Sequence, residues 1–345
     1  MKIGILFGGK SAEHEVSCIS ANSIYNNIDT DKYEVYLIGI TREGKFRHFT
    51  GNPDMMLDCS WENSVSGNRV DILGNENPAG IYGTDISVEL DCIFPVLHGP
   101  YGEDGRLQGI LDYSGIPYVG CKMMSSALCM DKIYTKQILN AEGVRQSRYA
   151  VVKKKYDIKD VISDLEGFTY PLFVKPANMG SSVGITKVKS QNELEDAINT
   201  ALRYDIKLLI EEGVDAREIE VSVLGNEDDI MVSTPGEIII NDDFYDYETK
   251  YVKSTSKLQI PAEITKEQIK AIKEIAEKSY KALECTGLSR VDFFIDRKDG
   301  SVILNEINTM PGFTKISMYP KLMEHDGVSY KQLITKLIEL SFKEI

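Results

Sequence analysis

The stretch FVKPANMGSSVGITKV, residues 173–188, decides which kind of fold the chain has. Its glycines and serines match the G-x-S-x-G motif with Ser182 as a nucleophile, and that motif requires a strand, a sharp turn and then a helix. Gly180 and Gly184 also bracket two hydroxyl side chains in the manner of a loop whose backbone amides wrap a phosphate. The two interpretations belong to different folds and to different enzyme classes.

The residues around this loop favour the tip of a hairpin. Residues 184–188 alternate and carry β-branched side chains, so a strand follows the turn where a hydrolase has a helix. The only histidine after Ser182 is His325, and its surroundings read as a helix end, so a catalytic triad is not favoured. Lys175, at the end of the preceding apolar strand, adds a positive charge suited to phosphate. A surface hairpin with a solvated lysine is the open alternative for this segment taken alone.

Composition narrows the classes of partner. The 345 residues carry 39 basic and 53 acidic side chains, a formal net charge of −14, which argues against a nucleic-acid partner. No apolar run is long enough to span a membrane. The apolar run at the start of the chain, residues 3–7, is too short for a signal peptide. We expect reduced thiols in a cytoplasmic protein, with a redox or zinc role not favoured, because no C-x-x-C pair occurs among the six cysteines: Cys18, Cys59, Cys92, Cys121, Cys129 and Cys285.

Hydrophobic periodicity divides the chain into three regions. Residues 1–120 are predicted to form an α/β domain with a mostly parallel sheet, because short apolar strands alternate with helices. Residues 121–345 are predicted to be α+β with antiparallel hairpins. They are expected to form two units, a central one (121–212) and a C-terminal one (213–345). Three local expectations are an irregular polar insertion at 51–90, a strand at 117–119 and one helix over 125–142.

A second polar pattern lies in SRVDFFIDRKDGSVILNEINTMPG, residues 289–312. If a hairpin turns near Asp299, Asp292 pairs with Glu306 and Arg290 with Asn308, and all four side chains share one face. Carboxylate and amide oxygens in this arrangement suit Mg²⁺ bound together with nucleotide phosphates. A solvated sheet face with paired charges is the alternative, but apolar residues between the polar ones favour the metal site.

Several long motifs in one order resemble the D-alanine–D-alanine ligases, members of the ATP-grasp superfamily. The resemblance covers essentially the whole chain, and Tyr101 is one departure, since many relatives carry a smaller polar residue there. The motifs are GGKSAEHEVS (8–17), HGPYGEDG (98–105), MDK (130–132), the glycine–serine loop (175–184), YDYETKY (245–251) and the segment 305–317.

The resemblance implies ATP-dependent joining of two D-alanines to D-alanyl-D-alanine, through a D-alanyl phosphate, for peptidoglycan precursors. D-serine or D-lactate as the second substrate is the alternative within the family. The implied ligands are ATP and D-alanine with two Mg²⁺ or Mn²⁺ ions, and homodimers are usual in the family. The polar segment 241–257 is expected to be a lid, because water would hydrolyse the acyl phosphate.

The resemblance also implies individual roles. Glu13 is expected to hold the ammonium group of the first D-alanine, with Ser181 and Tyr251 as its partners. Arg290 and the Gly312 amide are expected to stabilise the tetrahedral intermediate. The remaining positions are Lys132, Lys175, Ser182, Glu211, Val214, Glu218 and Lys250 for the nucleotide, Asp292, Glu306 and Asn308 for the metal, and His98, Ser317 and Met318 for the substrates.

Two other functional classes fit the sequence less well. A non-catalytic nucleotide sensor on the same fold is expected to lack Arg290 or a metal ligand, and neither is missing. A dehydrogenase is disfavoured because Gly8-Gly9, after the first strand, does not open a G-x-G-x-x-G motif.

Overall fold

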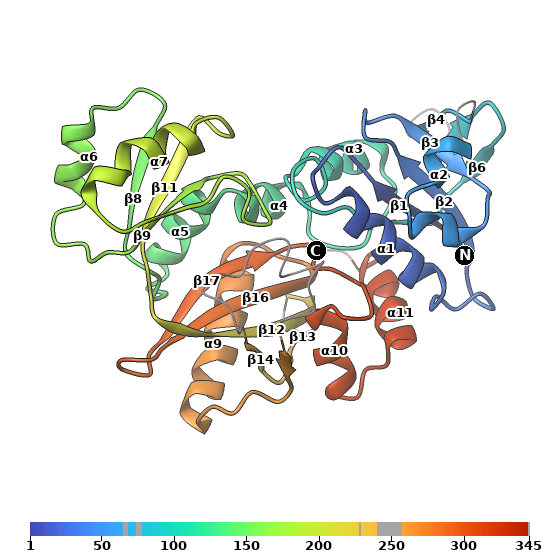
Figure 1. The fold of residues 1–345 in the computed structure, drawn as a ribbon. Helices are drawn as coiled ribbons and strands as arrows, with labels where there is room; N and C mark the ends of the chain where they lie inside the picture. The colour runs from blue at the N-terminus through green and yellow to red at the C-terminus, as the bar shows by residue number, and fades with distance from the viewer. Residues whose placement is uncertain (65–67, 74–77, 228, 240–256, 344–345) are drawn as a thin grey trace.

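The computed structural model describes residues 1–345 except 65–67, 74–77, 228, 240–256 and 344–345. Figure 1 shows three lobes, with the N-terminal sheet (blue), the central sheet (green to yellow) and the C-terminal sheet (yellow to red) arranged around a common centre. No helix in the described part of the chain is long and apolar enough to cross a membrane.

The N-terminal sheet is mostly parallel, as predicted, with the order β3-β2-β1-β7. β1 (Lys2–Gly8) pairs in parallel with β2 (Glu34–Ile40) and β7 (Cys92–Pro95), and β3 (Phe46–Phe49) is antiparallel to β2. Instead of the strand expected at 117–119, a single parallel bridge joins Tyr118 to Ile93.

Alternate residues of β1 enter two different cores. Ile5 and Phe7 pack in one core with residues of α1 (His14–Tyr25) and α11 (Tyr330–Leu340). Leu6 packs in the other core with residues of α3 (Arg106–Ser114). Because α11 comes from the end of the chain, the first core holds the N-terminal and C-terminal lobes together.

The segment 51–90 is more regular than the sequence suggests. It contains the 3-10 turn η1 (Pro53–Met56), helix α2 (Trp61–Ser64) and an antiparallel sheet of β4 (Val70–Leu73), β5 (Gly80–Gly83) and β6 (Ser87–Glu89). These strands have only three or four residues each, too few for a clear alternating pattern. The fully buried ring of Trp61 packs this segment against the N-terminal sheet. Its centroid lies 4.9 Å from the ring centroid of Phe7 in β1.

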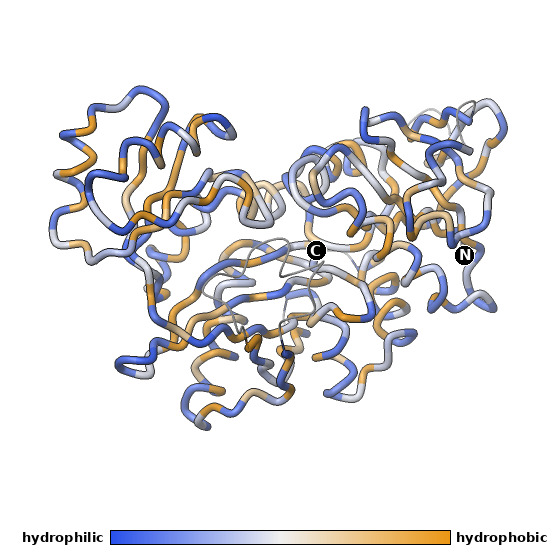
Figure 2. Tube along the Cα trace, viewed as in Figure 1, coloured by the Kyte–Doolittle hydropathy of each residue, from blue (hydrophilic) through white to orange (hydrophobic). Residues whose placement is uncertain are grey.

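The central sheet is antiparallel, with the order β10-β9-β11-β8. The hairpin predicted around the glycine–serine loop is confirmed, since residues of β9 and β10 pair in antiparallel register on either side of it. In Figure 2 apolar residues (orange) follow the strands and helices of this lobe, while its outer loops are mostly hydrophilic (blue). The elements are β8 (Tyr149–Lys153), α6 (Ile158–Asp164), β9 (Leu172–Pro176), β10 (Thr186–Val188), η2 (Gln191–Glu193), α7 (Leu194–Ala201) and β11 (Lys207–Glu212).

The prediction of one helix over 125–142 is wrong. α4 (Met123–Met130) and α5 (Lys132–Ala141) are separated at Asp131, whose backbone is extended. The Asp131 carboxylate accepts hydrogen bonds from the N–H groups of Ile133 and Tyr134 and so caps α5. The helical pattern of apolar residues continues from α4 into α5, so the sequence pattern alone does not reveal the break. The break places Lys132 at the first position of a new helix.

The C-terminal sheet has the order β15-β14-β12-β16-β17, with β13 beside β12. The predicted hairpin register is confirmed, since Arg290 lies opposite Asn308 and Asp292 opposite Glu306, with an irregularity directly afterwards. The elements are β12 (Ala216–Asn226), β13 (Asp229–Val232), β14 (Gly236–Ile239), β15 (Lys257–Gln259), α9 (Lys266–Ala282), β16 (Gly287–Asp296), β17 (Val302–Asn308), α10 (Met318–His325) and α11.

We predict that Gly39→Ala destabilises the protein by about 1–3 kcal/mol, the range for overpacking a core. A Cβ atom at Gly39 would lie 2.2–2.8 Å from three ring carbons of the buried Trp61. Urea unfolding at constant pH measures the change. Gly109→Ala is the control: it lies in helix α3 with 3.7 Å to the nearest atom, and should stabilise by about 0.5–1 kcal/mol. Equal stability of the two variants would contradict this account of Trp61.

Candidate active site

A cavity of about 780 Å³ lies where the three lobes meet and is lined by residues from all of them. The N-terminal lobe contributes residues near the ends of β1 and β7, the central lobe contributes the glycine–serine loop and β11, and the C-terminal lobe contributes β12 and the β16–β17 hairpin. The predicted site residues that line it are Glu13, His98, Lys132, Lys175, Ser181, Ser182, Glu211, Val214, Glu218, Arg290, Glu306, Asn308 and Gly312.

The glycine–serine loop reaches across the cavity to the N-terminal lobe. The Ser181 hydroxyl donates a hydrogen bond of 2.5 Å to Oε1 of Glu13, which is buried just before α1. Glycines let the backbone approach the same carboxylate, since a Cβ at Gly99 would lie 2.4 Å and one at Gly180 3.2 Å from Oε2. Ser181 and Ser182 both have positive φ, at 50° and 60°. Held backbone strain of this kind is typical of ligand-binding loops.

His98 ties the N-terminal lobe to the turn after β17. Its Nδ1 donates to the carbonyl of Met310 over 2.9 Å, and its Nε2 lies 3.2 Å from the Ser20 hydroxyl. Ser20 Oγ also accepts a hydrogen bond from the N–H of Phe313. Burial lowers the pKa of His98 below its usual value, although the charge of Glu13 opposes this. A neutral ring with its proton on Nδ1 satisfies all of these contacts.

Glu103 makes a second tie to the same turn. Its two carboxyl oxygens accept hydrogen bonds from the N–H groups of Gly99, at 2.6 Å, and Met310, at 3.0 Å. Burial, followed by the charge of Glu13, raises the pKa of Glu103 to about 8, against the effect of these two donors. The turn that carries Gly312 is thus fixed from the N-terminal lobe.

Three lysines lie at the end of the cavity formed by the central lobe, namely Lys132, Lys136 and Lys175. The Glu211 carboxylate forms ion pairs with Lys175 and, at 2.7 Å, with Lys136. Burial raises the pKa of Glu211, but the two lysines more than offset this and bring it to about 2. Lys132 donates to the carbonyl of Met179, and burial lowers its pKa, opposed by the carboxylate of Glu306.

The hairpin face carries one arginine among several carboxylates. Arg290 Nε and Nη2 each lie 2.7 Å from an oxygen of Asp292, and Nε lies 3.1 Å from Glu220. Asn308 donates to Asp292 Oδ2 over 3.0 Å. Glu220, Asp292 and Glu306 occupy directly opposed positions on β12, β16 and β17. The face therefore brings hard oxygen ligands and a fixed guanidinium to the wall of the cavity.

Some predicted residues lie elsewhere. Asp292 is buried and accepts hydrogen bonds from Arg290, and it is not among the residues that line the cavity. Ser317 Oγ accepts a hydrogen bond from the Thr314 N–H and stands 2.8 Å from where a Gly312 Cβ would be. Met318 is buried with Ile238 and Leu322 in a small core. Lys250 and Tyr251, and the expected lid except Lys257, lie outside the described residues.

The sequence interpretation overlooked Ser20, Lys136 and Glu220 and gave Glu103 no role. A signal existed for Glu103, which lies within the HGPYGEDG motif, and for Glu220, two residues after Glu218 on the same strand face. Lys136 follows Lys132 by one helical turn, so it lies on the same side of α5. Ser20 gave no signal, because its importance depends on a turn almost 300 residues away.

Comparison with known proteins places the chain among enzymes. Models described as the D-ala D-ala ligase N-terminus and C-terminus match residues 2–121 and 138–339. The D-alanine–D-alanine ligase of Caldicellulosiruptor bescii is 49% identical, over 100% of this chain and 96% of the relative.

Solved structures agree over the full length. The VanG D-Ala:D-Ser ligase from Enterococcus faecalis has a TM-score of 0.90 and 41% identity, covering 99% of each chain. The D-alanine–D-alanine ligase from Coxiella burnetii has a TM-score of 0.87 and 35% identity, over 99% of this chain and 93% of that one. The D-alanine–D-alanine ligase from Bacillus anthracis, complexed with ATP, has a TM-score of 0.74 and 28% identity, over 99% of this chain and 97% of that one. An α/β domain followed by an ATP-grasp unit is thus confirmed, and the chain belongs to the D-alanine–D-alanine ligase family.

Proposed function

We propose that the protein joins two D-alanines to D-alanyl-D-alanine at the expense of ATP, through a D-alanyl phosphate. The observation that carries this proposal is one cavity with Glu13 on one wall and Lys132, Lys175 and Arg290 on the others. A carboxylate suits the ammonium group of an amino acid, and cations suit transferring phosphoryl oxygens. The family membership supports the same reaction. We also propose that the protein acts as a homodimer in the cytoplasm.

The first half-reaction activates the carboxylate of one D-alanine. Glu13, oriented by the Ser181 hydroxyl, holds the substrate ammonium and so directs the opposite carboxylate toward ATP. A carboxylate oxygen attacks the terminal phosphorus of ATP, ADP leaves, and the acyl phosphate forms. We assign Lys132 and Lys175 to offset phosphate charge, and Val214 and Glu218, which line the same cavity, to bind adenosine.

The hairpin residues fit a divalent cation. Glu306 and Asn308 line the cavity, Asp292 stands opposite Glu306, and oxygen donors of this kind are the preferred ligands of Mg²⁺ and Mn²⁺. We assign Asp292, Glu306 and Asn308 as the ligands of two such ions. When bound, the ions would neutralise charge on the phosphate groups of ATP.

The second half-reaction forms the peptide bond. The free amine of the second D-alanine attacks the acyl carbon, and phosphate leaves with the former carboxylate oxygen. Arg290 and the Gly312 N–H stabilise the oxyanion that develops on the carbonyl oxygen. Arg290 is preorganised for this task by Asp292 and Glu220, and Gly312 by the bonds of His98 and Glu103 to its turn.

We predict that Arg290→Met lowers kcat by about 10²–10³-fold, the usual cost of one oxyanion donor, and changes ATP affinity little. Steady-state kinetics and ATP titration of the same preparation separate the two effects. Arg145→Met is the control, because the Arg145 side chain is exposed and pairs with the exposed Asp299. Collapse of ATP affinity with kcat retained would make Arg290 a nucleotide ligand.

We predict that Ser181→Ala reduces kcat/KM for D-alanine far more than Ser182→Ala does. The two serines are neighbours with similar positive φ, so alanine strains the backbone equally in both variants. The Ser181 hydroxyl donates a hydrogen bond of 2.5 Å to Glu13, so its removal frees the carboxylate that is assigned to the substrate ammonium. Loss of activity on labelling Ser182 with a fluorophosphonate would support a hydrolase and contradict the ligase proposal.

We predict D-alanine as the preferred second substrate, against the D-serine alternative that the VanG-like structure keeps open. Met318 is buried with Ile238 and Leu322 and presents no hydrogen-bond donor for a serine hydroxyl, so the extra hydroxyl would gain little from this position. Equal D-alanine, D-serine and D-lactate with ATP and Mg²⁺ should give D-alanyl-D-alanine as the main product by mass spectrometry. Its yield should rise toward alkaline pH, because the attacking amine must lose a proton. A main product of D-alanyl-D-serine or D-alanyl-D-lactate would assign the chain to the alternative.

A further inference from the structure

A group of metal-binding side chains lies in the N-terminal lobe, apart from the residues that line the cavity. A ring nitrogen of His14 and the Sγ atoms of Cys18 and Cys59 all lie within 4.8 Å of one another. His14 and Cys18 are one turn apart on the same face of α1. Cys59 comes from the loop between η1 and α2 and has a φ of 60°. Both α1 residues are fully buried, and Cys59 is partly exposed.

One nitrogen of His14 points to a missing ligand. Nδ1 lies 2.7 Å from the carbonyl oxygen of Gly9, and because a carbonyl only accepts, Nδ1 carries the proton. Nε2 is buried and has no hydrogen-bond partner among the described residues. A buried nitrogen without a partner is destabilising, so a ligand on Nε2 would remove this penalty.

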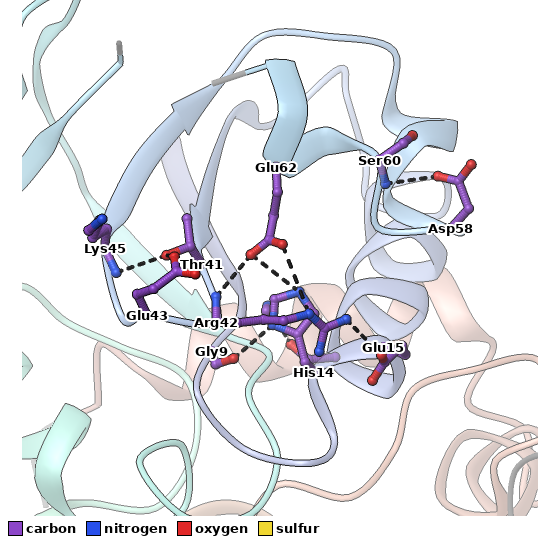
Figure 3. Close-up of polar contacts among 12 residues, drawn as sticks. Gly9, His14, Glu15, Thr41, Arg42, Glu43, Lys45, Asp58, Ser60 and Glu62 are labelled. Atoms are coloured by element: carbon purple, nitrogen blue, oxygen red, sulfur yellow. Dashed lines mark hydrogen bonds and ion pairs between the residues drawn. The ribbon is translucent and has the colours of Figure 1, made fainter. Parts of the chain in front are cut away.

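A carboxylate lies beside the same nitrogen. Glu62 Oε1 is 3.9 Å from His14 Nε2, and Figure 3 shows the Glu62 side chain reaching down toward the His14 ring and Arg42. The backbone N–H of Arg42 donates to Glu62 Oε1 over 2.9 Å, which fixes the position of the carboxylate. Glu62 thus offers an oxygen ligand on the His14 side of the cluster.

We propose that His14, Cys18, Cys59 and Glu62 bind a Zn²⁺ ion. Thiolate and imidazole are the ligands that zinc takes in tetrahedral sites, at about 2.3 Å for sulfur and 2.0 Å for nitrogen. Neighbouring ligand atoms of such a site stand roughly 3.4–3.8 Å apart. The ligand atoms of His14, Cys18 and Cys59 lie within 4.8 Å of one another, so their separations need to close by about an ångström. The charges of two thiolates and Glu62 balance those of Zn²⁺ and Arg42.

A disulfide between Cys18 and Cys59 accounts for less of the geometry. It would use the two sulfurs but would leave His14 Nε2 unsatisfied. The absence of a C-x-x-C pair argues against zinc only for ligands close in sequence. Here the ligands come from α1 and from the 51–64 segment, which the fold brings together.

Zinc at this position would join the 51–64 segment to the start of α1. Glu13 directly precedes His14, and the Gly9 carbonyl that His14 binds belongs to the same loop. Bound zinc is therefore expected to stabilise the N-terminal lobe and the support of Glu13. The site itself does not depend on the ligase reaction, so its test is independent of the proposed activity.

The test uses the full chain without an affinity tag, reduced and then stripped with a chelator. Added Co²⁺, a spectroscopic substitute for zinc, should give a thiolate-to-metal charge-transfer band and the visible bands of a tetrahedral site. Equimolar Zn²⁺ should displace the Co²⁺ and raise the melting temperature. Loss of a residue that only supports a metal ligand typically weakens metal binding by roughly 10–100-fold. Because Cys59 is proposed as a ligand itself, Cys59→Ser should weaken Co²⁺ binding by more than this. Cys129→Ser is the control: Cys129 lies outside the cluster, so Co²⁺ binding should be unchanged.

A second measurement needs no substitution. Zn²⁺ should slow alkylation of Cys59 by iodoacetamide in the unaltered chain, as measured by peptide mass spectrometry. The proposal is overturned if Co²⁺ gives no thiolate band, if Cys59→Ser keeps the full spectrum, or if Zn²⁺ leaves the alkylation of Cys59 unchanged. Formation of a Cys18–Cys59 disulfide in the presence of excess Zn²⁺ would also overturn it.

Discussion

Three side chains of the N-terminal lobe satisfy the backbone of the turn after β17, and the geometry of the site depends on these bonds. His98 donates to the Met310 carbonyl, Glu103 accepts from the Met310 N–H, and Ser20 accepts from the Phe313 N–H. The bonds of His98 and Ser20 are buried and that of Glu103 is partly buried, so the loss of any of them would leave a polar group poorly satisfied. They fix Gly312, on the C-terminal lobe, relative to Glu13, on the N-terminal lobe.

Each of the three lobes contributes a different set of charged side chains to the cavity. The central lobe presents lysines held by Glu211, the C-terminal lobe presents carboxylates held by Arg290, and the N-terminal lobe presents Glu13. Opposite charges buried close together stabilise each other strongly only when they stay paired. Substrates that carry both an ammonium and phosphate groups complement this pattern, which is the physical basis of the proposed ligase reaction.

Local patterns in the sequence predicted much of the site. The alternation after Gly184 identified the first hairpin. The spacing of Arg290, Asp292, Glu306 and Asn308 predicted the register of the β16–β17 hairpin, because a strand's side-chain period is fixed at two. The break between α4 and α5 was not predictable from periodicity, since a cap at Asp131 interrupts a continuous hydrophobic pattern. The position of Met318 in a core and the tie from Ser20 to the turn depend on contacts between distant segments.

The central claim is that the carboxylate of the first D-alanine is phosphorylated before the amine attacks. The most direct test is the transfer of oxygen from D-alanine labelled with ¹⁸O in its carboxylate, with ATP, Mg²⁺ and the purified protein. The mechanism breaks the bond between the acyl carbon and the bridging oxygen, so ¹⁸O should appear in the released inorganic phosphate in proportion to dipeptide formed. Dipeptide formed with unlabelled phosphate would show that no acyl phosphate lies on the pathway and would contradict the account.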